Sequence, residues 1–372
     1  MTSSQTAKTA ETARILDGKA TAAAIKADFG EQAPLDGVYH DGTPGHRMHN
    51  LYPLLYNRAV WDATAEATGE PIIWARSAWA GSQRYPLHWG GDSTADWSNL
   101  GPQLCGGMSF GLSGFPFWSQ DIGGFLGRPD GDLLIRWLQI GLFGSHARIH
   151  GESDRELDTW GPDVAEVARE LLDLRYRLLP TIWAAARRAA ERSLPMLRPL
   201  VVDHQDDPTT WRIADQWTFA DALLVAPVLD PTGQRRVYLP AGSWVDWWTG
   251  ELVDTDHGGR WIAVDAPLEQ IPLFQRAGTV VALGPSMQHV DERTVDELEL
   301  RVVPPRAGEL LEAASFEVDD ERSHDVRVTP LDASAASAAV DLGDGPVVRI
   351  SARVAGPSGW GDPVEVNGPL RW

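Results

Sequence analysis

Short apolar runs alternate with stretches of helical periodicity over the first half of the chain. The apolar runs cover residues 22–26, 72–75, 87–89, 114–118 and roughly 144–148. Their shortness and their apolar character are typical of buried strands. The stretches between them that fit a helix are 47–69, 94–108 and 129–142. This alternation predicts α/β architecture with a parallel sheet or barrel.

The clearest helix covers residues 162–192. Pro162 stands at its first turn, where a missing backbone N–H costs nothing. Apolar side chains then recur at spacings of three and four, at Val164, Val167, Leu171, Leu174, Leu178 and Ile182. We expect Pro180 to kink this helix, because proline removes one hydrogen bond of the helical ladder.

The pattern changes after about residue 195. Short apolar runs separated by Gly, Pro and Asp turns predict an all-β region of the sandwich type, with strands near 222–229, 236–239 and 279–283. Beyond about residue 290, alternating runs at 298–303 and 347–354 predict a second β module. The predicted divisions are an irregular N-terminus (1–21), an α/β domain (22–194), a proximal β-sandwich (195–288) and a distal β domain (289–372).

Composition and charge exclude several classes of protein. Lys plus Arg number 32 and Asp plus Glu number 52, so the net charge is −20, which argues against nucleic-acid or membrane-surface binding. Cys105 is the only cysteine, which excludes an intrachain disulfide and a multi-cysteine zinc site. There is no apolar run long enough for a membrane helix, and the polar N-terminus does not resemble a secretory signal. We therefore expect a cytoplasmic protein.

Polar side chains follow five successive predicted strands. Asp28 comes after the first strand, Arg76 after the second, Asp92 after the third, Asp121 after the fourth, and His150 near the fifth. In an α/β barrel all such strand ends open on one face, and that face carries the active site. One Asp after a strand is usually a helix N-cap, but capping does not explain five in a row.

Metal and nucleotide chemistry lack support in the sequence. The ten histidines include no pair at i,i+4 spacing with an intervening Glu, and no glycine-rich phosphate loop is present, so we expect no metal and no cofactor. A GxSxG motif places Ser109 before Asp121 and either His146 or His150, as in a serine hydrolase. The motif requires a strand before the serine and a helix after it, whereas here the predicted order is inverted.

The remaining chemistry is a carboxylate pair that cleaves a glycosidic bond. The chain has 17 Trp, and indole rings stack well on sugars, although filling the core is the commoner use of Trp. The indoles nearest to the carboxylates in sequence are Trp79, Trp89, Trp97 and Trp118.

Several segments, taken in order, resemble glycoside hydrolase family 31, the retaining α-glycosidases. They are IKADFGE, MHNLYPLLYNRAVW, ARSAWAGSQRYPLHWGGDS, GLSGFPFWSQDIGGF and ARIHG, followed in the β region by DALLVAPVL, VYLPAGSWVDWWTGE and IPLFQRAGTVV. The resemblance covers about residues 22–285. Within the family, Lys26 and the sequence His-Trp-Gly-Gly-Asp ending at Asp92 are similar to the α-xylosidase branch. The α-glucosidase branch more often has an aromatic residue at the position of Lys26.

The resemblance implies an enzyme that hydrolyses terminal α-linked xylose or glucose from oligosaccharides. Asp28 matches the nucleophile, Asp92 the general acid/base and Glu31 a supporting carboxylate. The residues that match contacts with the sugar are Lys26, Arg76, Trp89, Phe125 and His150. Asp121 matches an acidic position that we expect to orient Arg76.

The chain departs from the family at its N-terminal side. The family's (β/α)₈ TIM barrel follows an N-terminal sandwich, but only 27 residues precede Asp28, which the resemblance places at the end of the fourth strand. We therefore expect a partial barrel, about strands 4–8, followed by β-sandwich domains. A gene fragment, a non-catalytic remnant, half of a split enzyme with a missing N-terminal portion, and a mis-set start codon stay open. Xylose against glucose specificity, the aglycone, hydrolysis against transglycosylation, and a homo-oligomeric state stay open too.

Overall fold

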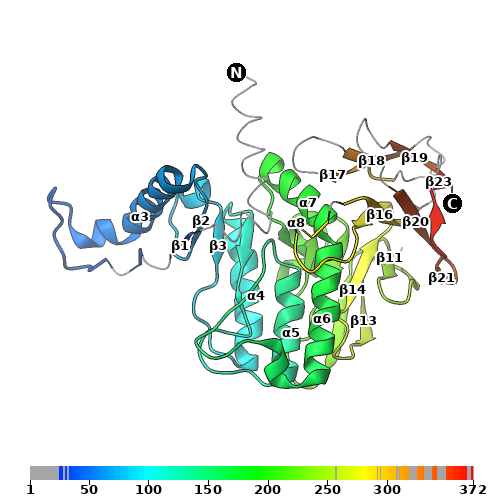
Figure 1. Cartoon of the computed structure of the whole chain (residues 1–372), viewed down its shortest axis with the longest axis horizontal. Coiled ribbons are helices and arrows are strands. Elements are labelled where there is room, and N and C mark those ends of the chain that lie inside the picture. Colours follow the sequence, from blue (N-terminus) through cyan, green and yellow to red (C-terminus); the bar gives the residue numbers. More distant parts are fainter. Residues whose placement is uncertain are drawn as a thin grey trace.

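The computed structural model describes most of the chain from residue 25 onward (Figure 1). The described residues are 25–27, 30–31, 33–255, 258–290, 292–293, 295–306, 309, 311–317, 325–330, 337–341, 349–366 and 370–371. The irregular N-terminus expected over 1–21 and the nucleophile candidate Asp28 lie outside the described residues.

A four-stranded parallel sheet forms the N-terminal part of the described chain. Its strands lie in sequence order, β1 (Ile25–Ala27), β2 (Ile73–Ala75), β3 (Leu87–Trp89) and β4 (Phe117–Ser119). Helix α3 (Gly45–Thr68) connects β1 to β2, and helix α4 (Trp97–Leu112) connects β3 to β4. All residues of β2, β3 and β4 are buried, as expected for parallel strands covered by helices. The carboxyl ends of all four strands therefore meet at one edge.

Two further parallel strands continue the α/β pattern. Strand β5 (Asp121–Ile122) follows β4 almost directly, and β6 (Arg148–Ile149) pairs with it after helix α5 (Gly131–Leu142). The carboxylate of Asp130 caps α5 by accepting a hydrogen bond from the backbone N–H of Leu133 at 2.8 Å. The prediction of a partial TIM barrel is confirmed by these parallel strands and their helices.

The long predicted helix is two helices. A single residue, Leu178, separates helix α6 (Pro162–Arg177) from helix α7 (Leu179–Arg192). Pro180 lies in the first turn of α7, where proline needs no hydrogen-bond partner. The expected kink is therefore a break at Leu178.

The chain after α7 is mainly β-structure, as predicted. A six-stranded antiparallel sheet has the order β12 (Leu252–Asp254), β11 (Ser243–Asp246), β14 (Leu273–Arg276), β9 (Leu223–Val225), β8 (Trp217–Phe219) and β7 (Leu197–Pro199). A separate pair joins β10 (Gln234–Leu239) to β13 (Arg260–Asp265). The four-residue helix α8 (Leu200–Asp203) follows β7.

The distal part contains two more sheets. The first joins β15 (Thr279–Leu283), β16 (Glu297–Val303), β20 (Arg349–Gly356) and β21 (Gly359–Trp360), with β22 (Val364–Glu365) also paired to β20. The second joins β17 (Ala314–Glu317), β18 (Asp325–Pro330), β19 (Ser337–Asp341) and β23 (Leu370–Arg371). Strands β16 and β20 are parallel, whereas the second sheet is antiparallel throughout.

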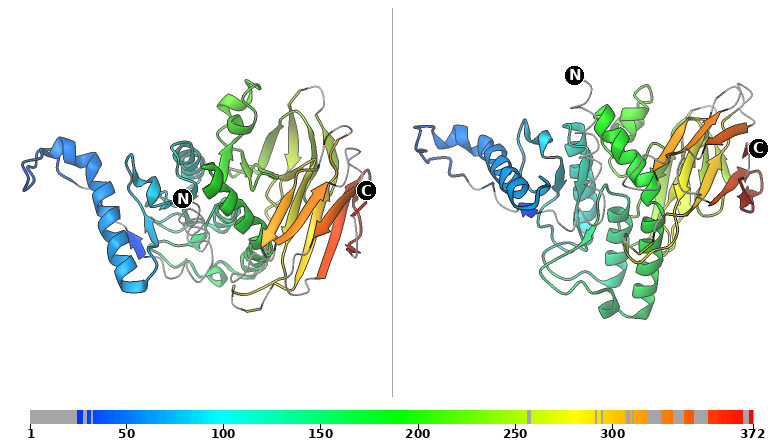
Figure 2. Two further views of the ribbon diagram at one scale, coloured as in Figure 1. Left: turned by 90° about the horizontal axis from the view of Figure 1, so that it is seen from above. Right: turned by 45° about the horizontal axis from the view of Figure 1, so that its top comes forward.

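The α/β part and the β part share one hydrophobic core. Figures 1 and 2 show α3 at one end of the molecule, the C-terminal sheets at the other, and α5, α6 and α7 between them. The main cluster of buried residues runs from Ile72 to Leu283. Buried Arg136 on α5 donates to the carbonyl groups of Ala266, Pro267 and Gln270, which ties the helix to a loop of the β region. Within the described residues, no helix is both long and apolar enough to cross a bilayer.

Candidate active site

Arg76 joins two carboxylates at the carboxyl edge of the parallel sheet. It directly follows β2, and its Nη1 donates to Oδ2 of Asp92 at 2.7 Å. Its Nε lies 3.3 Å from Oε1 of Glu31. All three side chains are partly exposed, so a ligand can reach them. Arg76, Asp92 and Glu31 thus lie together at this edge of the sheet.

Two glycines bring Asp92 to this position. Gly91 has a φ of +75°, which favours glycine, and a side chain there would press on the guanidinium of Arg76. Gly90 packs so closely that a Cβ would lie 2.1 Å from Oε1 of Gln103. The Gly-Gly pair therefore lets the chain turn sharply beyond β3 and approach both Arg76 and α4.

A cavity of about 640 Å³ opens beside the Arg76 cluster. Glu31, Arg76, Trp89 and Asp92 form part of its wall. One face of α4 supplies another part, with residues at spacings of four, three and four: Asn99, Gln103, Gly106 and Phe110. We did not predict these α4 residues as part of the site. A test of the helix for polar residues at this spacing would have found Asn99 and Gln103.

Phe125 and His150 form a second group next to Asp92. The backbone N–H of Phe125 donates to the carbonyl of Ser93 at 2.7 Å, which fixes Phe125 beside the residue that follows Asp92. The rings of Phe125 and His150 lie 5.5 Å apart with a tilt of 40°. Both side chains are half-buried. They can therefore extend the site beyond the cavity that Arg76 lines.

Asp121 does not orient Arg76, so that prediction is wrong. Its fully buried carboxylate forms an ion pair with Arg148. The cause is the strand register, because Asp121 of β5 lies directly opposite Arg148 of β6. The guanidinium of Arg148 also lies 4.5 Å from the ring centre of Trp74, which is itself in edge contact with Trp89. Asp121 thus supports the site indirectly, because it holds Arg148, which contacts Trp74.

The four candidate indoles differ in their positions. Trp89 and Trp118 are buried and line the cavity. Trp79 is 49% exposed, and Trp97 packs against the main core. Neither Trp79 nor Trp97 is among the described residues that line the cavity, so only two of the four are placed to contact a sugar there.

The serine-hydrolase alternative is excluded by the geometry. Ser109 lies inside α4 and not at a turn between a strand and a helix. Asp121 pairs with Arg148, and His146 bonds instead to the hydroxyls of Ser119 and Ser145. A nucleophile elbow needs the sharp turn that a helix interior does not have.

Two of the predicted site residues are described only in part or not at all. Lys26 belongs to β1, where its backbone pairs with Trp74, but its side chain lies outside the description. Asp28 lies outside the described residues altogether. Its role as nucleophile therefore stays a prediction, as does the substrate contact of Lys26.

Two buried histidines lie under the site. Burial lowers the pKa of His88 to about 4, and the rings of Phe110 and Phe115 pack against it. Burial, with a smaller effect of nearby Arg175, lowers the pKa of His146 to about 3. Both are neutral at pH 7: His146 hydrogen-bonds to the hydroxyls of Ser119 and Ser145, whereas His88 is a packing group.

The described residues contain no group of three or more His, Cys, Asp or Glu side chains that could hold a metal ion. The described side chains that line the cavity include carboxylates, a guanidinium and aromatic rings. Such a set suits general acid/base and nucleophilic attack on a hydroxyl-rich ligand.

Known families and proteins match most of this chain. Residues 4–185 match the glycosyl hydrolases family 31 TIM-barrel domain, and residues 193–281 match the glycosyl hydrolase family 31 C-terminal domain. An alpha-xylosidase of Emericella nidulans is 34% identical over 81% of this chain and 40% of its own length. Alpha-glucosidase 2 of Bacillus thermoamyloliquefaciens is 34% identical over 69% of this chain and 34% of its own length.

A solved structure gives a consistent result. The cycloalternan-forming enzyme from Listeria monocytogenes, in complex with a pentasaccharide substrate, superimposes with a TM-score of 0.78 and 26% identity. The alignment covers 88% of this chain and 32% of that enzyme. The chain thus spans less than half the length of these relatives, and it belongs to glycosyl hydrolase family 31.

Proposed function

We propose that the site belongs to a retaining α-glycosidase that removes terminal α-linked xylose from oligosaccharides, with terminal α-linked glucose as the alternative substrate. The observation that carries the proposal is the bridge from Glu31 through Arg76 to Asp92 at the carboxyl edge of a parallel sheet. In an α/β barrel this edge is the catalytic face.

The strand register supports Asp28 as the second carboxylate. Ala27 of β1 pairs with Ala75 of β2, and in the sequence Asp28 follows the first of these residues and Arg76 the second. Neighbouring strands lie about 5 Å apart, so we expect Asp28, the next residue in the sequence after Ala27, to act beside the Arg76 cluster. A retaining pair needs its two carboxyl groups about 5–5.5 Å apart.

The proposed reaction has two steps. In the first, the carboxylate of Asp28 attacks the anomeric carbon while Asp92 gives its proton to the glycosidic oxygen, which leaves with the aglycone. In the second, Asp92 takes a proton from a water that attacks the same carbon, and the bond to Asp28 breaks. Oδ2 of Asp92 is held by Arg76 at 2.7 Å, which would orient the carboxyl group for this proton transfer.

Arg76 and the aromatic walls would position the sugar. A guanidinium donates along several directions at once, so Arg76 can hold the carboxylates and a sugar hydroxyl together. Trp89 and Trp118 offer apolar surface to the C–H faces of a sugar ring. Phe125 and His150, next to Ser93, extend this wall.

Xylose is proposed ahead of glucose because Lys26 and the His-Trp-Gly-Gly-Asp segment resemble the α-xylosidase branch. The relatives include enzymes named for both sugars. The two sugars differ by one hydroxymethyl group, and a pocket discriminates such a difference by about 10- to 200-fold.

The test is turnover of 4-nitrophenyl α-xyloside and 4-nitrophenyl α-glucoside by the full chain and by its Asp28→Asn and Asp92→Asn variants. We expect both variants to lose a factor of about 10² or more in kcat/KM and the xyloside to be preferred. Comparable activity in either variant would contradict the assigned roles. Preference for the glucoside would select the alternative substrate.

A further inference from the structure

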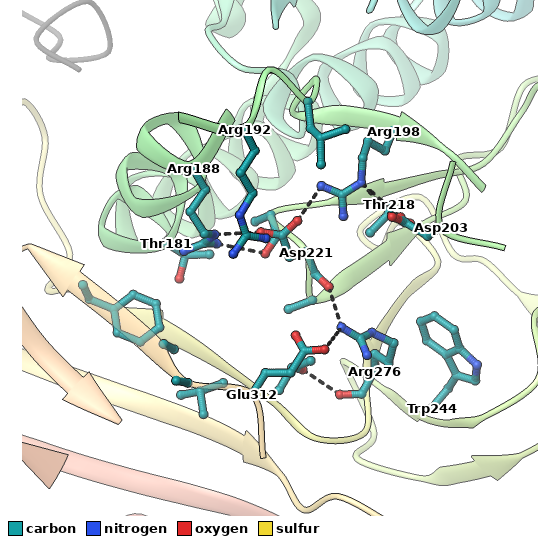
Figure 3. A pocket seen from close by; sticks show the side chains of 18 of the residues that line it. Thr181, Arg188, Arg192, Arg198, Asp203, Thr218, Asp221, Trp244, Arg276 and Glu312 are labelled. Atoms are coloured by element: carbon teal, nitrogen blue, oxygen red, sulfur yellow. Dashed lines mark hydrogen bonds and ion pairs between the residues drawn. The ribbon is translucent and has the colours of Figure 1, made fainter. Parts of the chain in front are cut away.

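A second cavity, of about 360 Å³, lies between α7, the turn from β8 to β9, and the segment before β17 (Figure 3). Its walls share no residue with those of the cavity beside Asp92. The lining includes apolar residues and seven charged side chains: Arg188, Arg192, Arg198, Arg276, Asp203, Asp221 and Glu312. In Figure 3, Arg188 and Arg192 extend into the cavity from α7, and Arg276 and Glu312 lie on the opposite side.

Most of these charges are already paired. Asp221 accepts from both Arg188 and Arg198, Asp203 accepts from Arg198, and Glu312 accepts from Arg276. Four guanidinium groups face three carboxylates, so one positive charge remains. Within the described part of the chain that charge belongs to Arg192, which makes no ion pair and is exposed.

The cavity is held in shape before any ligand binds. Ala220 and Asp221 both have positive φ values, 53° and 64°, in the turn between β8 and β9. This turn directs the carboxylate of Asp221 between Arg188 and Arg198. Burial alone would raise the pKa of Asp221, but these two guanidinium groups outweigh it and lower the pKa, so the carboxylate stays charged and holds them in place. A ligand would therefore meet a rigid wall with Arg192 available.

A cavity with both an unpaired guanidinium and carboxylates suits a ligand that carries an anionic group and hydroxyl groups. Guanidinium groups bind the oxygens of a phosphate through charge-assisted hydrogen bonds. Carboxylates such as Glu312 accept hydrogen bonds from hydroxyls but repel a second anionic group. The volume is large for a phosphate ion alone and falls in the range of small-molecule sites. We propose that this cavity binds a phosphorylated monosaccharide, with the phosphate at Arg192 and Arg188 and the sugar hydroxyls toward Glu312.

The test is isothermal titration calorimetry of the full chain with glucose 6-phosphate, glucose and inorganic phosphate at matched ionic strength. We expect one glucose 6-phosphate per chain, with glucose and inorganic phosphate each bound at least tenfold more weakly. Equal affinity for inorganic phosphate would overturn the role of the sugar hydroxyls, and equal affinity for glucose would overturn the role of the guanidinium groups. Absence of glucose 6-phosphate binding would overturn the proposal as a whole.

A variant pair locates the binding. Arg192→Gln removes the unpaired charge without breaking an ion pair, so we expect an unchanged melting temperature and affinity for glucose 6-phosphate reduced about tenfold or more. Arg169→Gln, an equal charge change on the exposed face of α6, should leave the affinity unchanged. Arg192→Lys keeps the charge and should lose less than Arg192→Gln. Equal binding by the Gln variant and the unaltered chain would contradict the placement.

Discussion

At the scale of single residues, Arg76 has the most demanding geometry in the proposed active site. Its Nε faces Glu31 while its Nη1 holds Asp92, so two nitrogens of one planar group serve two different carboxylates. A lysine carries the same charge on one nitrogen and cannot reproduce this fork. The shape of the side chain, and not only its charge, thus matters at this position.

We expect Arg76→Lys to reduce kcat/KM on an α-xyloside by about 10- to 100-fold, because Asp92 or Glu31 loses its partner. Arg58→Lys is the matched control, since Arg58 lies on the exposed surface of α3 in an ion pair with Asp62 and should leave kcat/KM unchanged. Unaltered kcat/KM in Arg76→Lys would show that the fork has no role.

The sequence was informative about which residues gather at the site and less so about their pairing. The polar residues after successive strands predicted the proximity of Arg76 and Asp92, because strand ends of a parallel sheet share an edge. It did not predict the partner of Asp121. That partner depends on the register between β5 and β6, two short strands whose pairing is set by tertiary packing.

At the scale of elements, helix α4 has two functions. Its polar face lines the cavity through Asn99 and Gln103. Its inner face packs on β4, where Gly107 lies so close to Trp118 that an added Cβ would be 2.4 Å from the indole ring. The neighbouring Gly106 has open space around it. One helix therefore offers a matched pair of glycines.

Gly107→Ala should lower the free energy of unfolding by about 1–3 kcal/mol, because the helix or Trp118 must shift. Gly106→Ala should raise it by about 0.5–1 kcal/mol, since alanine favours a helix and nothing obstructs the new methyl group. Urea unfolding of the two variants measures both values. Equal effects of the two substitutions would contradict the described packing of α4 on β4.

Two strands were predicted with their bounds, whereas the predicted strands at 22–26, 114–118 and 144–148 differ by up to four residues at an end from β1, β4 and β6. The runs 87–89 and 279–283 match β3 and β15 residue for residue, since each is bounded on both sides by Gly or Pro. The stretch 162–192 has unbroken helical periodicity, yet the helix stops at Leu178. The periodicity continues because both helices bury apolar faces in the same core, so the pattern alone does not show the break.

At the scale of the whole molecule, buried neutral histidines make stability depend on pH. The folded-state pKa values of His88 and His146 are about 4 and about 3, below the value of about 6.5 expected in an unfolded chain. At a pH between the folded-state and the unfolded-state pKa values, these histidines bind protons in the unfolded chain but not in the folded chain. Stability is therefore fully present above about pH 6.5 and falls as the pH drops toward 4.

Each histidine should contribute a loss of about 1.4 kcal/mol of unfolding free energy per pH unit within that window. His146→Gln keeps a hydrogen-bonding side chain beside Ser119 and removes the titrating group. Between pH 7 and pH 5 this variant should lose about 2 kcal/mol less than the unaltered chain in urea unfolding. If the free energy of unfolding had the same pH dependence in this variant and in the unaltered chain, His146 would not be a group that gains a proton on unfolding.

The overall architecture followed from the sequence because hydrophobic periodicity reports it directly. Alternating strands and helices predicted the parallel sheet, and the change of pattern near residue 195 predicted the β region. The contact between these parts was not predictable, because it rests on side chains such as Arg136, which bonds to carbonyl groups about 130 residues away. The same reasoning applies to the cavity at Arg192, whose walls come from distant segments.

We propose that Asp28 and Asp92 act from opposite sides on one anomeric carbon. Proton NMR of the first sugar released from 4-nitrophenyl α-xyloside tests it most directly, because two successive displacements retain the configuration. We expect the α-anomer to appear first and mutarotation then to form the β-anomer. Initial formation of the β-anomer would mean a single displacement by water, and it would contradict Asp28 as nucleophile.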